Sequence, residues 1–232
     1  MWGPLTSLVF TALIWLVFNL LTIGIAILFM RYGWGEARIR PNQLGNNGLF
    51  LAVSTLVNAA VCCALIVSLV RLRGGLPVAD YLGLKPARVR DALMWLGILI
   101  LFIVTSEGIG YWMQRPVVPE FMVTAYETAG VPVLLWLALI VAAPVFEEVL
   151  FRGFLQNGLQ LSRMHGGLVL LLPAFIWAGI HLQYDFYDMS WVFLFGILLG
   201  LARWHTDSLL VPLGMHMLVN LLATVVTALM LA

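Results

Sequence analysis

Long apolar segments are the feature that most limits what this chain can fold into. Seven of them occur along its 232 residues, and each approaches the ~20 residues that a helix needs to cross a bilayer. They run over residues 5–30, 49–70, 92–113, 133–160, 167–184, 189–204 and 208–230. Only helices and closed barrels satisfy their backbone in lipid, and barrel strands would alternate polar with apolar residues. The unbroken runs therefore predict transmembrane helices.

The composition supports the same class. Hydrophobic residues make up 62% of the chain and charged residues only 10%, whereas a soluble domain carries about 25% charge. We expect an all-α fold, a polytopic bundle of about seven spans surrounded by the lipid bilayer. The net charge of +1 gives no reason to expect a nucleic-acid partner.

The polar residues divide the chain into two parts. Residues 1–130 are interpreted as N-terminal transmembrane helices with their connecting loops. Residues 131–232 hold most of the polar residues within spans, so we expect the last four spans to form the catalytic core. The loop over 114–130 is interpreted as a connector rather than a re-entrant segment. The two cysteines, Cys62 and Cys63, are neighbours in an apolar run and are interpreted as packing residues.

Lysine and arginine in the loops indicate orientation, because cytoplasmic loops carry an excess of them. With seven spans, one side carries seven such residues and the other carries four. The seven are Arg71, Arg73, Lys85, Arg88, Arg90, Arg163 and Arg203, and the four are Arg31, Arg38, Arg40 and Arg115. The excess predicts an N-terminus in the cytoplasm.

Two adjacent carboxylates stand inside the fourth apolar segment. Ionisable groups at membrane depth are costly, and they usually mark function. Glu148 and Arg152 are four residues apart, so they share a helix face and can pair. Glu147 is rotated about 100° from that face and has no obvious partner in the sequence. This arrangement favours a structural role for Glu148 and a chemical role for Glu147.

Two histidines and an asparagine follow in later spans. His181 is near the end of the fifth span, and His216 and Asn220 are four apart in the seventh. Counted from the predicted inner ends of their helices, Glu147 and His181 both lie ~22 Å in, Asn220 ~20 Å and His216 ~14 Å. The four side chains can therefore meet at a similar depth.

These groups suit hydrolysis by water. A carboxylate with an imidazole can act as a general base, and a second imidazole with an amide N–H can stabilise an oxyanion. No Gly-x-Ser-x-Gly motif supplies a serine nucleophile. Glu147, His181 and His216 could instead bind a metal such as zinc, although the His-Glu-x-x-His helix of metalloproteases is missing. The residues alone leave both mechanisms open.

Three motifs in this order make the chain resemble a known family. They are Glu-Glu-x-x-x-Arg from Glu147 to Arg152, aromatic-x-x-x-His from Trp177 to His181, and His-x-x-x-Asn from His216 to Asn220. Together they are similar to the type II CAAX endopeptidase and bacteriocin-processing group, also called CPBP or Abi intramembrane proteases. The resemblance covers about residues 130–225. Trp177 stands where that family commonly has Phe, and we expect its packing against the site to be kept.

The resemblance implies a glutamate-dependent intramembrane endopeptidase. It implies that Glu147 and His181 activate the water, that His216 and Asn220 form the oxyanion site, and that Glu148, Arg152 and Trp177 support them. It favours a reaction without a cofactor, with a divalent metal as the alternative. The implied substrate is a membrane-associated peptide or protein, with or without a lipid or a C-terminal sorting tail.

The resulting hypothesis is a protease of a bacterial inner membrane. We expect Pro144 to bend the fourth helix and to open a cavity for water and peptide beside the glutamates. A transporter or proton relay could use the same buried groups, but it would predict paired broken helices that the sequence lacks. A non-enzymatic membrane scaffold or bacteriocin-immunity protein is the other alternative.

Overall fold

The computed structural model describes residues 2–32 and 44–232, and all regular elements in these ranges are helices. The long helices are α1 (Pro4–Tyr32), α3 (Gly48–Arg73), α5 (Val89–Trp112), α11 (Phe186–Thr206) and α12 (Leu210–Met230). The shorter helices α4 (Val78–Leu82), α6 (Glu120–Glu127) and α10 (Gly166–Gly179) lie between them. Arg38 and Arg40, which were used to predict orientation, lie outside the described residues.

The predicted fourth span, residues 133–160, is confirmed and is a composite helix. It runs over α7 (Pro132–Trp136), η1 (Leu137–Ala142), α8 (Ala143–Glu148), η2 (Val149–Gln156) and α9 (Asn157–Leu161). η1 and η2 are π-helical, with wider turns than an α-helix. The helical backbone continues through Pro144, which lies in the first turn of α8 directly after η1, and the bend expected there stays a prediction.

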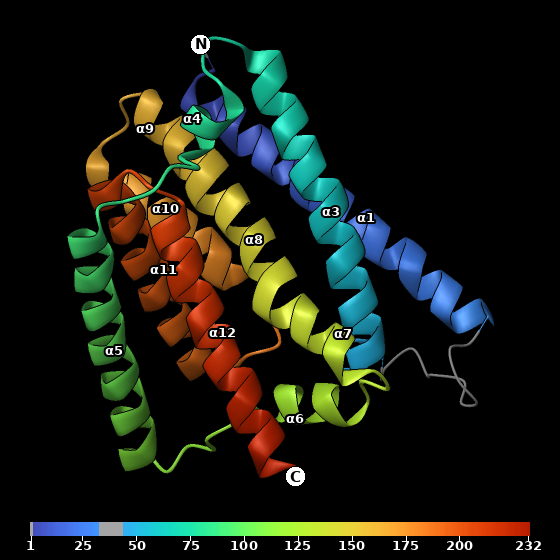
Figure 1. Ribbon diagram of the computed structural model, residues 1–232. Coiled ribbons are helices and arrows are strands. Elements are labelled where there is room, and N and C mark those ends of the chain that lie inside the picture. The colour runs from blue at the N-terminus through green and yellow to red at the C-terminus, as the bar shows by residue number, and fades with distance from the viewer. Residues whose placement is uncertain (1, 33–43) are drawn as a thin grey trace.

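The protein is an integral membrane protein built as a polytopic helical bundle. In the described ranges, six helices are long and apolar enough to cross a membrane, including the composite helix. The predicted fifth span is shorter than expected: α10 has 14 residues and ends at Gly179, so His181 follows the helix instead of lying within it. The helices alternate in direction, and the two termini lie at opposite ends of the bundle (Figure 1).

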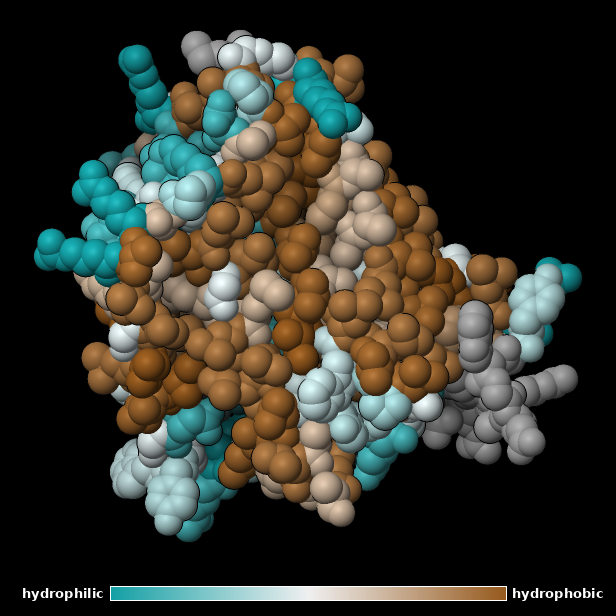
Figure 2. Space-filling view, viewed as in Figure 1, coloured by the Kyte–Doolittle hydropathy of each residue, from teal (hydrophilic) through white to brown (hydrophobic). Residues whose placement is uncertain are grey.

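The helices of the second half form the centre of the bundle (Figure 1). α10 packs along α11, α12 contacts α11 and η1, and α3 contacts both α1 and the composite helix. By contrast, α5 stands at the edge, where only Trp95 and Leu99 are buried. Figure 2 shows apolar residues over most of the face in view, with polar residues gathered towards the ends, as a bilayer requires.

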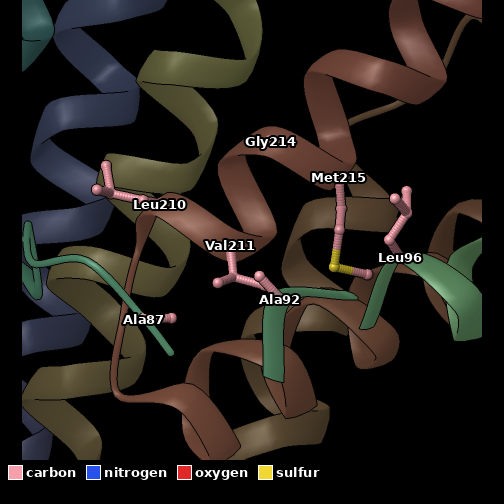
Figure 3. A pocket seen from close by; sticks show the side chains of 7 residues that line it. All are labelled: Ala87, Ala92, Leu96, Leu210, Val211, Gly214 and Met215. Atoms are coloured by element: carbon pink, nitrogen blue, oxygen red, sulfur yellow. The ribbon is translucent and has the colours of Figure 1, made fainter. Parts of the chain in front are cut away.

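A cavity of about 300 Å³ lies between α5 and α12. Figure 3 shows Leu96 of α5 and Met215 of α12 among its lining side chains, all of which are apolar. A second apolar cavity, of about 280 Å³, lies between α1, η2 and α10. Glu147 lines neither cavity, so neither is the water-filled opening that we expected beside Pro144.

The 114–130 loop is more ordered than the predicted connector. It contains α6, which contacts α3 and α12. Gly48 at the start of α3 permits this contact: its N–H donates to Thr128 at 2.8 Å. A Cβ atom at Gly48 would lie only 1.8 Å from the carbonyl oxygen of Ala125.

We predict that Gly48→Ala displaces α6 and lowers the free energy of unfolding by about 1–3 kcal/mol, the usual range for overpacking. Thermal unfolding in detergent measures this loss. Gly45→Ala is the matched control, because a Cβ there meets nothing within 4 Å. Equal stability of the two variants would contradict the close packing of α6 on α3.

Candidate active site

The predicted ion pair of the composite helix is present and completely buried. Arg152 Nη1 donates to Glu148 Oε1 at 2.8 Å, and the two side chains are 1% and 0% exposed. His216 of α12 contacts the same oxygen through Nδ1 at 2.9 Å. Because a carboxylate oxygen accepts, Nδ1 of His216 carries the hydrogen. Glu148 therefore links its own helix to α12.

Two further hydrogen bonds connect the composite helix to α11. Arg152 Nη2 donates to the carbonyl oxygen of Gly196 at 3.1 Å, and Gln156 donates to that of Gly200 at 2.9 Å. The two donors are four residues apart on the composite helix, and the two acceptors are four apart on α11. The second bond therefore lies about one helical turn from the first. Gly196 and Gly200 allow the close approach, since a Cβ at Gly200 would lie 3.2 Å from Gln156.

Glu147 is placed differently from its neighbour. Its side chain remains 17% exposed, and its Oε2 lies 3.9 Å from Nε2 of His216. The indole N–H of Trp177 donates to the same Oε2 at 2.5 Å. Glu147 thus has the partner that the sequence did not reveal. In the described part of the chain, no hydrogen bond from a side chain or the backbone reaches its Oε1.

His181 lies just after α10, with Nδ1 2.7 Å from the carbonyl oxygen of Trp177. A carbonyl oxygen can only accept, so Nδ1 carries the hydrogen and Nε2 of the neutral ring keeps its lone pair. The ring of Trp177 makes edge-to-face contacts with both imidazoles, its centroid lying 5.0 Å from that of His181 and 5.4 Å from that of His216. Both predicted histidines therefore flank the indole that holds Glu147.

The segment after His181 is fixed by aromatic and ionic contacts. The ring of Tyr184 stacks on that of His181 with centroids 6.0 Å apart, and Phe121 of α6 packs against Tyr184. Asp185 caps α11 by accepting from the N–H of Asp188 and also pairs with Arg115. The N–H of Asp188 and the guanidinium of Arg115 lower the pKa of Asp185. These contacts anchor the short segment that carries His181.

Asn220 is near the cluster but has another partner. Its Nδ2 donates to the carbonyl oxygen of Leu139 in η1 at 2.7 Å. In the described ranges no hydrogen bond joins it to His216, although both lie on α12 one turn apart. An amide nitrogen has two hydrogens, so one N–H of Asn220 remains for another acceptor.

The residues proposed as alternative metal ligands are Glu147, His181 and His216. Across residues 2–32 and 44–232, no group of three or more His, Cys, Asp or Glu side chains has a geometry that could hold a metal ion. Glu147 and His216 approach each other, but Glu148 occupies Nδ1 of His216. The cysteines are free and lie in α3, apart from the cluster in sequence.

The comparison with protein families agrees with the resemblance that the three motifs indicate. Residues 129–222 match the model of a family described as type II CAAX prenyl endopeptidase Rce1-like. Over these residues, the chain is similar to the Rce1-like family. The matched segment includes all seven predicted site residues, from Glu147 to Asn220.

A curated relative extends the similarity beyond the Rce1-like segment. An Escherichia coli protein described as "Uncharacterized 24.3 kDa protein" is 28% identical over 181 residues, which cover 75% of this chain and 78% of the relative. No solved structure matches the chain. The Rce1-like match therefore indicates peptidase chemistry in general, while the substrate and the residue roles are matters for proposal.

We predict that Arg152→Met lowers the free energy of unfolding by roughly 3–5 kcal/mol, because it leaves the buried Glu148 carboxylate without its cation. The double variant with Glu148→Gln should recover part of that loss. Chemical unfolding in detergent gives both values.

Lys85→Met provides the control for this prediction. It breaks a pair with Asp207 whose side chains are 49% and 70% exposed, so its effect should stay within about 1 kcal/mol. If Arg152→Met and Lys85→Met cost the same, the buried pair does not stabilise the bundle as argued.

Proposed function

We propose that this protein is an intramembrane endopeptidase that hydrolyses a peptide bond with water activated by Glu147 and His181. The observation that carries the proposal is the unequal use of the two adjacent glutamates. Each glutamate has one oxygen that accepts no hydrogen bond in the described part of the chain, but that of Glu148 is buried beside Arg152 and His216, whereas the side chain of Glu147 is 17% exposed. The Rce1-like match supports peptidase chemistry for this segment.

Glu147 acts as the general base. Trp177 occupies its Oε2, so Oε1 is the oxygen that takes a proton from the attacking water. His181 assists through Nε2, whose lone pair is kept by the bond from Nδ1 to the Trp177 carbonyl. The water oxygen attacks the peptide carbonyl carbon, and the abstracted proton passes to the leaving amine. No covalent bond to the protein is required.

His216 and Asn220 stabilise the oxyanion that this attack creates. Nδ1 of His216 is fixed on Glu148, so its Nε2 is directed towards Glu147 and can donate when it is protonated. Asn220 contributes the amide N–H that Leu139 does not use. Donors of this kind usually supply a large part of the rate enhancement in acyl transfer.

The proposed substrate is a membrane-associated peptide or protein, cut near the part that is held in the bilayer. The family description supports a lipid-bearing C-terminal tail as one form of that substrate. The Escherichia coli relative supports a bacterial source, the apolar helices support a location in the cell membrane, and the excess of lysine and arginine supports a cytoplasmic N-terminus.

We predict that Glu147→Gln lowers kcat at least a hundredfold, because Gln has the shape of the base without its basicity. Purified protein in liposomes is mixed with lipidated and plain membrane peptides, and the products are identified by mass spectrometry. Glu107→Gln is the matched control, since Glu107 is an exposed glutamate of α5. Full activity of Glu147→Gln would refute Glu147 as the base.

The same assay distinguishes the mechanisms. Under the proposed mechanism, we predict that cleavage persists in the presence of a chelator. If cleavage is lost in the presence of a chelator and recovers when zinc is added, Glu147, His181 and His216 act as metal ligands instead. If a cellular phenotype of the wild type survives Glu147→Gln, a non-enzymatic scaffold or immunity protein explains it better.

A further inference from the structure

Trp177 packs in the core and also contacts several polar residues of the candidate site. It is 2% exposed and lies on α10, in contact with α8, α11 and α12. Its N–H donates to Glu147, and its ring makes edge-to-face contacts with the rings of His181 and His216. The guanidinium of Arg152 lies 4.5 Å from the ring centroid, and Phe195 packs against the same ring.

We propose that Trp177 is a positioning residue whose indole N–H fixes Oε2 of Glu147 and leaves Oε1 as the oxygen that takes the proton from water. This inference rests on the proposed function. It concerns this chain in particular, because the phenylalanine that is common at this position in the resembling family has no hydrogen to donate.

The physical argument begins with the two oxygens of a carboxylate. Without a donor, rotation about the last side-chain bond exchanges them, and the base has no defined orientation. A hydrogen bond from a neutral donor to an ionised carboxylate removes that freedom, and such bonds are stronger than neutral ones. The donor here is buried, so water does not compete effectively for it.

The indole itself is held rigidly by the structural network. Arg152 binds Glu148 and the carbonyl oxygen of Gly196, and its guanidinium faces the ring of Trp177 in a cation–π contact. Gly196 provides room for the ring, since a Cβ there would lie 3.0 Å from the indole. The buried ion pair therefore orients Trp177, and Trp177 orients the reactive carboxylate.

Two variants separate the N–H from the ring. Trp177→Phe removes the N–H and part of the ring, whereas β-(3-benzothienyl)alanine at position 177 keeps the bicyclic shape and replaces N–H with sulfur. Both should lower kcat roughly ten- to a hundredfold, the effect of one hydrogen bond to a charged group, with KM unchanged. Trp95→Phe is the control, because Trp95 donates to His205 at the other end of α11 and should leave both constants as they are.

A second readout does not depend on activity. In protein labelled with ¹⁵N-tryptophan, the resonance of the Trp177 indole is the one of nine that disappears in Trp177→Phe. Removing the acceptor with Glu147→Ala should shift that resonance upfield, while the resonance of Trp95 stays in place. Glu107→Ala should move neither.

The outcomes are distinguishable. A Trp177 resonance that ignores Glu147→Ala, or a benzothienyl variant with the kcat of the wild type, would overturn the positioning role. A wild type that cuts no peptide, together with a resonance that responds to Glu147→Ala, would count against the proposed proteolysis and leave the hydrogen bond established. A fall in kcat in both variants and a responsive resonance support the inference.

Discussion

The free-energy cost of burying charged side chains in a membrane protein constrains how the helices of the second half of this chain are arranged. Glu148 and Arg152 are almost inaccessible, and neither would be tolerated at that depth alone. Besides pairing with each other, Arg152 donates to the carbonyl oxygen of Gly196 in α11, and Glu148 accepts from His216 of α12. Because removal of any member leaves a buried charge or donor unpaired, the ion pair also fixes how three helices are arranged.

The two adjacent glutamates, Glu147 and Glu148, lie in different surroundings. Adjacent positions on a helix are rotated by about 100°, so Glu148 faces the interior of the bundle while Glu147 faces the junction with α10. Glu148 is completely buried, with Arg152 and His216 both bound to its Oε1, whereas Glu147 stays partly exposed and is held by Trp177. The difference follows from helix geometry, with no need for a special backbone conformation at either residue.

Much of this arrangement could be predicted from the sequence. The apolar runs located the helices, because a helix that crosses the bilayer appears in the sequence as a long, unbroken apolar segment. The four-residue spacing of Glu148 and Arg152 predicted their ion pair. Counting residues along the helices predicted that Glu147 and His216 can meet at a similar depth, and the structure places Oε2 of Glu147 3.9 Å from Nε2 of His216. These features depend on local composition and on the rise of a helix.

Other features depended on contacts that no local pattern encodes. The N–H of Trp177 was unpredictable because its acceptor lies 30 residues earlier in the chain. The end of α10 before His181 was missed because the apolar run continues past Gly179, and the stacking of Tyr184 was missed with it. The assigned roles of His181, His216 and Asn220 are predictions that await kinetics.

The shortness of α10 has a consequence for the surrounding lipid. Its 14 residues extend only ~21 Å, whereas the hydrocarbon core is ~30 Å thick. A hydrophobic stretch that is too short makes the neighbouring bilayer thinner, and the non-helical backbone after Gly179 must lie in protein or beside water. Thinning of this kind would bring headgroups and water closer to the end of α10 that precedes His181. A thinner bilayer would give water, the second reactant of hydrolysis, access to the Glu147 carboxylate, which apolar helices otherwise surround. The local thickness of the bilayer would then influence the rate of the proposed reaction.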